Sequence, residues 1–128
     1  MSERSRSEST LTVAGIVVLR CDATGPPVGT TQDALDLIGA AAGARASWIL
    51  LPVERLDERF FHLANGMAGE FLQKLVNYGL RLAIVGLPSA GLEQSKPLRD
   101  FVRESNRGRQ IWFVAGEAEL AERLQEAR

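Results

Sequence analysis

Apolar and polar positions along this chain follow two alternating patterns. Between residues 65 and 78, apolar side chains recur every three or four positions and form one stripe of a helix, with Glu70, Lys74 and Asn77 on the opposite side. Residues 80–85 follow as a short apolar run with one charge, which is typical of a strand covered on both faces. A helix that leads into a strand within two residues predicts half of a β-α-β unit.

Alternation of the same kind extends over the rest of the sequence. Strands are expected at residues 11–13, 16–21, 47–53, 80–85 and 110–115, and helices at about 31–42, 65–78, 96–107 and 117–127. The order β-β-α-β-α-β-α-β-α predicts an α/β fold with a single mixed, mostly parallel sheet of about five strands. We expect residues 1–9 to be a disordered tail and residues 10–128 to form a single α/β domain.

Capping residues mark the expected helix ends. Thr30 or Thr31 can accept a hydrogen bond from a first-turn amide of the first helix, and Gly43 suits its end. Asn65 has the same capping property for the second helix.

Two glycines, Gly66 and Gly69, lie in or beside the first turn of the second helix. Because glycine lowers helix propensity, a bare backbone is expected to be needed there. Close packing of this turn on the sheet is the favoured interpretation, and close approach of a ligand is the alternative.

Composition excludes several classes of protein. The 128 residues carry a net charge of -1, so neither nucleic acid nor an anionic membrane is predicted as a partner. The single cysteine, Cys21, excludes an internal disulfide and suits a reducing compartment. No apolar run approaches the ~20 residues that span a bilayer, and the N-terminus lacks a signal-peptide core, so a cytoplasmic protein is predicted.

Catalytic and metal-binding motifs are incomplete. The lone histidine, His62, lies near Asp57 and Glu58, but no G-x-S-x-G motif supplies a nucleophile. One histidine among scattered carboxylates lacks the ligand spacing of a zinc site, and the loop at residues 86–91 lacks the phosphate-binding glycine signatures. We therefore predict no metal and no cofactor.

A ligand site, if present, is expected where the strands end. In open α/β sheets, ligands bind at the loops beyond the carboxyl ends of the strands, which here are residues 22–29, 54–65 and 86–94. Glu54 or Asp57 would be the acid or base of an enzyme at this place. The candidate ligand-binding residues are Glu54, Asp57, Asn65 and Ser89.

Two polar clusters are candidate partner surfaces. One is the helix face on which Glu70 precedes Lys74 by four residues, the favourable order for an ion pair. The other follows the third helix, at the opposite end of the strands, and is rich in the fork-shaped donors that suit carboxylate or phosphate. The candidate partner-binding residues are Glu70, Lys74, Asn77, Glu104, Asn106, Arg107 and Arg109.

Two long motifs resemble a known family. NGMAGEFLQKLVNY, preceded by ERFF and followed by RLAIVG, and SKPLRDFVRESNRGRQIWFV are similar to the bacterial domain of unknown function 4180. QDALDLIG and ILLPVERLD fit the same family, and the resemblance covers about residues 13–120. It implies a fold and names no activity.

The element order also resembles the sulfate transporter and anti-sigma antagonist (STAS) domain. That regulatory module binds kinases and is switched by phosphorylation of a serine at the start of its second helix. The corresponding turn here is residues 63–67, in which Asn65 stands where the serine would be.

These observations favour a small cytoplasmic binding or regulatory module that recognises a protein partner, or itself as a homodimer, through a helix face. The alternative is a small-molecule-binding protein or enzyme that uses the loops at the carboxyl ends of the strands. A carboxylate with a raised pKa in a closed pocket would favour an enzyme, and an exposed apolar helix stripe would favour the module.

Overall fold

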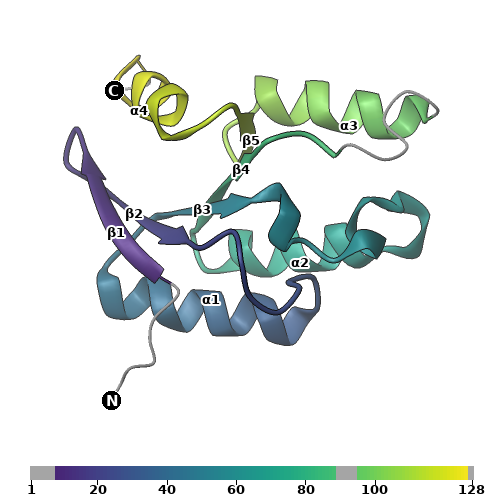
Figure 1. The fold of residues 1–128 in the computed structure, drawn as a ribbon, viewed down its shortest axis with the longest axis horizontal. Helices are drawn as coiled ribbons and strands as arrows, with labels where there is room; N and C mark the ends of the chain where they lie inside the picture. The colour runs from purple at the N-terminus through teal and green to yellow at the C-terminus, as the bar shows by residue number, and fades with distance from the viewer. Residues whose placement is uncertain (1–7, 89–94, 127–128) are drawn as a thin grey trace.

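A five-stranded sheet forms the centre of the molecule in the computed structural model, which describes residues 8–88 and 95–126 (Figure 1). Its strands are β1 (Glu8–Val13), β2 (Ile16–Cys21), β3 (Trp48–Pro52), β4 (Arg81–Val85) and β5 (Ile111–Val114). They lie in chain order, with β1 antiparallel to β2 and every other neighbouring pair parallel. The predicted α/β fold with a mixed, mostly parallel sheet is confirmed.

Within the described ranges, four α-helices cover the sheet: α1 (Thr31–Ala44), α2 (Met67–Asn77), α3 (Lys96–Arg107) and α4 (Glu117–Glu126). Since the parallel strands follow one another in order, right-handed crossovers place α1, α2 and α3 on one face. Figure 1 shows α1 and α2 side by side there, and α4 on the opposite side of the sheet. No helix of the described ranges is long and apolar enough to cross a membrane.

Both faces of the sheet are buried, as the apolar strands predict. Along β3, Ile49 and Leu51 join the core beneath α1 and α2, whereas Trp48 and Leu50 join the core beneath α4. The rings of Trp48 and Trp112 meet on the α4 face with centroids 4.6 Å apart. Ala83 pairs with Trp112 in register and belongs to the same core.

The N-terminal boundary and the end of α1 differ from expectation. Strand β1 begins at Glu8, so Glu8 and Ser9 of the expected tail belong to the sheet, and residues 1–7 lie outside the described ranges. Thr30 caps α1 and forms a reciprocal pair of bonds with Asp33. Gly43 was wrongly expected to end this helix, because Arg45 adopts the left-handed conformation instead and donates its amide to the carbonyls of the last turn.

Helix α2 begins two residues later than predicted. Asn65 belongs to a preceding 3-10 turn, although its Oδ1 still accepts a bond from the amide of Met67 at 2.8 Å. Close packing was the wrong explanation for the two glycines, because a Cβ at Gly66 or Gly69 would meet no atom within 4 Å. Gly66 is needed for its left-handed backbone, with φ at 80°, where the chain turns into the helix.

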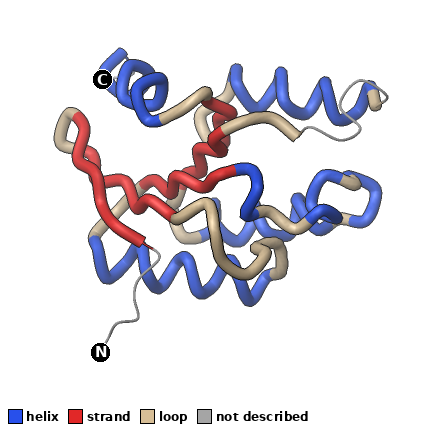
Figure 2. The backbone as a smooth tube through the Cα atoms, in the orientation of Figure 1, coloured by secondary structure: helices blue, strands red, loops and turns tan. Residues whose placement is uncertain are grey.

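Residues 53–65 are more ordered than the predicted loop. They form three short 3-10 helices, Val53–Arg55, Glu58–Phe61 and Leu63–Asn65, which Figure 2 shows as helical turns between β3 and α2. This segment, called here the 3-10 segment, lies at the carboxyl end of β3 and forms one wall of a groove.

Candidate functional site

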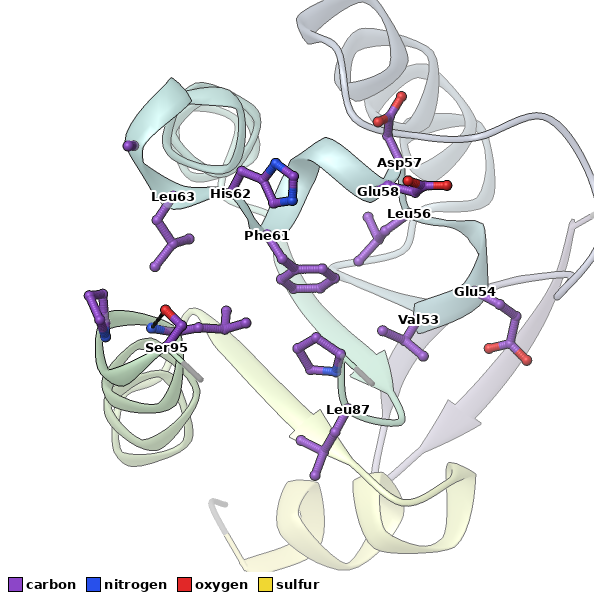
Figure 3. Close-up of a pocket in the computed structure, with 14 residues that line it drawn as sticks. Val53, Glu54, Leu56, Asp57, Glu58, Phe61, His62, Leu63, Leu87 and Ser95 are labelled. Atoms are coloured by element: carbon purple, nitrogen blue, oxygen red, sulfur yellow. Dashed lines mark hydrogen bonds between the residues drawn. The ribbon is translucent and has the colours of Figure 1, made fainter. Parts of the chain in front are cut away.

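A groove of about 1000 Å³ lies at the carboxyl ends of β3 and β4 (Figure 3). One wall is the 3-10 segment, and the other is formed by Leu87, Pro88, Ser95, Pro97 and Leu98. This is the end of the sheet at which a ligand site is expected in an open α/β fold. Its volume is at the upper end of the range for small-molecule sites.

The groove is apolar in its centre and acidic at one side. Figure 3 shows Phe61 in the middle of the groove, with Leu63 on one side of it and the carboxylates of Asp57 and Glu58 on another. Glu54 completes three acidic side chains, and no lysine or arginine lines the groove among the described residues. The arrangement suits a ligand that combines an apolar body with a positive charge.

Phe60 anchors the 3-10 segment to the core. Its side chain is fully buried, with its ring edge-on to those of Phe61 and Phe71 at centroid distances of 5.3 and 5.5 Å. Phe61 is only partly buried and lines the groove. Two neighbouring phenylalanines therefore have separate tasks, one in the core and one at the groove.

Arg55 holds the loop of residues 22–29 against the 3-10 segment. Its guanidinium donates to the carbonyls of Asp22, Thr24 and Pro26 at 3.0 to 3.2 Å, and only 9% of the residue is exposed. A Cβ at Gly25 would lie 2.9 Å from Arg55 Cζ, so the loop passes directly over the guanidinium.

Sequence reasoning missed this role of Arg55. The only signal was the loop's paired prolines, which supply carbonyls without amide donors and so leave acceptors that need a donor from elsewhere.

Asp57 lines the groove as a permanently ionised group. Side-chain hydrogen bonds from Arg59, together with the Arg59 amide, lower the pKa of the Asp57 carboxyl to about 2. This is the opposite of the raised pKa expected of an acid or base that works near neutral pH. Asp57 is therefore paired with Arg59 and is unsuited to proton transfer.

The lowered pKa of Asp57 can be tested by titration. Its carboxyl 13C chemical shift is expected to titrate with a midpoint near pH 2, below the ordinary value of 3.8. Because the native pKa is the lower one, this carboxylate stabilises the fold above about pH 4, and its contribution is lost as the pH falls toward 2. Arg59→Gln is expected to raise the midpoint toward 3.8; an unshifted midpoint in the unmodified protein would contradict the assignment.

The predicted ligand-binding residues separate in the structure. Glu54 and Asp57 line the groove. Asn65 instead lines a smaller cavity of about 430 Å³ beside Thr30 and Glu70, near the starts of α1 and α2. Ser89 lies outside the described residues.

The polar side chains on α2 do not form the expected ion pair. Glu70 and Lys74 form no ion pair with each other in the described structure, and instead Gln73 donates to Asn77 Oδ1 at 2.9 Å. Beyond Asn77, the side chain of Tyr78 is 58% exposed.

The residues of the second predicted partner surface, Glu104, Asn106, Arg107 and Arg109, make different contacts. Asn106 Oδ1 accepts a hydrogen bond from the backbone amide of Phe113 at 2.6 Å. It therefore satisfies a backbone N–H on the outer edge of β5. Glu104 lines a small cavity with Arg109, whereas Arg107 and Arg109 both line a separate cleft at the amino ends of the strands.

The described part of the chain contains no candidate metal site. No group of three or more histidine, cysteine, aspartate or glutamate side chains able to hold a metal ion occurs within residues 8–88 and 95–126. In the groove, the Ser95 hydroxyl already accepts a bond from the Leu98 amide as the N-cap of α3.

These features define a small α/β domain with an apolar, acid-rimmed groove at the carboxyl end of a mixed sheet. The family model Domain of unknown function (DUF4180) matches residues 13–124, and the chain therefore belongs to that family. No curated protein and no solved structure matches the chain. The likeness to the sulfate transporter and anti-sigma antagonist domain stays a prediction.

Proposed function

We propose that this protein is a binding protein that takes a small amphipathic cation in the groove between the 3-10 segment and the start of α3. The observation that carries the proposal is the groove itself, an apolar surface around Phe61 with acidic side chains at one side only. An apolar site with a few placed charged groups is the usual design of a small-molecule site.

The sign of the ligand charge follows from the charged side chains among the residues that line the groove. The three groove carboxylates are Glu54, Asp57 and Glu58, and only Asp57 has a cationic partner, Arg59. Glu54 and Glu58 form no ion pair with another described residue. A cationic group is therefore favoured near these two carboxylates and an anionic group is disfavoured.

Binding is proposed in preference to catalysis because no catalytic set is assembled among the described side chains of the groove. Asp57 is held ionised by Arg59, and the Ser95 hydroxyl caps a helix. His62 lines the groove, but no hydrogen bond joins it to Ser95 or to a carboxylate in the described structure. The nucleophile, base and orienting group of a triad are therefore not assembled there.

A matched pair of probes tests the proposal. 3-Phenylpropylamine and 3-phenylpropanoate share one apolar body and carry opposite charges, and we expect the amine to bind at least several-fold more tightly in a calorimetric titration. Glu58→Gln is expected to reduce this preference, while Glu70→Gln on α2 removes the same charge away from the groove and leaves it unchanged. Equal binding of the two probes, or binding of neither, would sink the proposal.

A second candidate function is recognition of a protein partner or self-association as a homodimer through α2. The observation in its favour is the pair of exposed apolar side chains Val76 and Tyr78, which flank Asn77 of the predicted partner face and are 39% and 58% exposed. Measuring the mass in solution of the unmodified chain and of a Val76→Lys variant tests it. A monomeric mass for both at high concentration would exclude self-association.

A further inference from the structure

We propose a second binding site, for a small phosphate-bearing ligand, in the cleft at the amino ends of the strands. This cleft has a volume of about 370 Å³, within the range of small-ligand sites. Its described charged lining is four arginines, Arg81, Arg107, Arg109 and Arg123, and one glutamate, Glu126. The cleft lies at the opposite end of the sheet from the groove, so the two sites are separate.

One of these arginines, Arg123, already has bonding partners within the protein and forms a fixed part of the wall. The guanidinium of Arg123 lies 3.9 Å from the centroid of the Trp112 ring and donates to the Asn106 carbonyl at 2.8 Å. Trp112 in turn donates its Nε1 to the Gly108 carbonyl at 2.8 Å and packs against Trp48. Two nearly buried tryptophans therefore give the cleft a rigid floor.

The other three arginines have no such partners. The guanidinium groups of Arg81, Arg107 and Arg109 make no hydrogen bond or ion pair with another described residue, although they line one cleft. Arg107 lies in the last turn of α3, where the helix dipole by itself favours a cation. Arg81 begins β4 and Arg109 precedes β5, so helix termini do not account for them.

Phosphate is the ligand chemistry that best uses several separate guanidinium groups. One guanidinium can satisfy a carboxylate through two parallel bonds, whereas a phosphate group offers three acceptor oxygens that point in different directions. Arginines from two strand starts and a helix end approach the cleft from different elements, as such an acceptor requires.

Calorimetric titration of the full chain with inorganic diphosphate tests this site. We expect saturable binding that weakens as the salt concentration rises, and about tenfold weaker binding in Arg81→Gln and in Arg109→Gln. Lys74→Gln removes one positive charge from α2 and is the matched control, with affinity expected to stay within about twofold of the unmodified protein. Malonate, a dicarboxylate of similar size, is expected to bind more weakly than diphosphate.

Three results would overturn the assignment. They are the absence of saturable diphosphate binding, an equal loss of affinity in all three variants, or malonate binding as tightly as diphosphate. Melting temperatures of the variants establish that each is folded, which we expect because Arg81 and Arg109 are exposed.

Discussion

Phe60→Ala is expected to lower the free energy of unfolding by about 3–5 kcal/mol, the usual cost of removing a buried phenylalanine ring. The ring is fully buried between Phe61 and Phe71, and the substitution leaves a cavity beneath the 3-10 segment. Total stabilities of small domains are about 5–15 kcal/mol, so the loss should be evident in a urea unfolding curve.

The adjacent residue supplies the matched control. Phe61→Ala removes the same group from a partly exposed position that lines the groove. We expect a smaller loss of stability than for Phe60→Ala, together with weaker binding of 3-phenylpropylamine. Equal destabilisation by the two substitutions would contradict the division of tasks between the two rings.

Arg55→Ala is the second substitution with a large expected effect. It leaves three carbonyls of the loop at residues 22–29 without their donor, and hydrogen bonds to charged groups contribute about 1.5–3 kcal/mol each. Since the freed loop can regain bonds to water, we expect a net loss of about 2–4 kcal/mol in the free energy of unfolding. Arg59→Ala, which removes an exposed arginine of the same segment, should cost much less.

A double-mutant cycle with Gly25 tests the contact itself. Gly25→Ala places a methyl group 2.9 Å from Arg55 Cζ and adds backbone strain, because φ at Gly25 is 140°. The strain persists when Arg55 is replaced by alanine, but the clash with the guanidinium disappears. Gly25→Ala should therefore cost less in the Arg55→Ala background, and strictly additive effects would show that the loop is held by something else.

The sequence predicted the sheet well because its strands carry local signals. The runs around Ile49 and Ile84 are apolar on both faces, and each helix is amphipathic, so element type and order follow from periodicity. The sheet order then follows from short right-handed connections. Helix ends were less predictable, because Arg45 rather than Gly43 adopts the left-handed conformation.

The groove lies at the end of the sheet where a ligand site was expected, but its lining residues were predicted only in part. Topology indicates the carboxyl end of the sheet, and Glu54 and Asp57 do line the groove there. Single 3-10 turns carry no periodic pattern, so nothing in the sequence distinguishes buried Phe60 from Phe61 at the groove. The partners of Arg55 lie 29 to 33 residues away along the chain, beyond the reach of any local pattern.

The proposed binding of an amphipathic cation in the groove at the carboxyl ends of β3 and β4 can be located residue by residue. The most direct test is a map of backbone amide shifts in 15N-labelled protein as 3-phenylpropylamine is added. We expect saturable shifts around Phe61, His62, Leu87 and Leu98, on both walls of the groove. Saturable shifts confined to α2 or to the arginine cleft, or no saturable shifts at all, would contradict it.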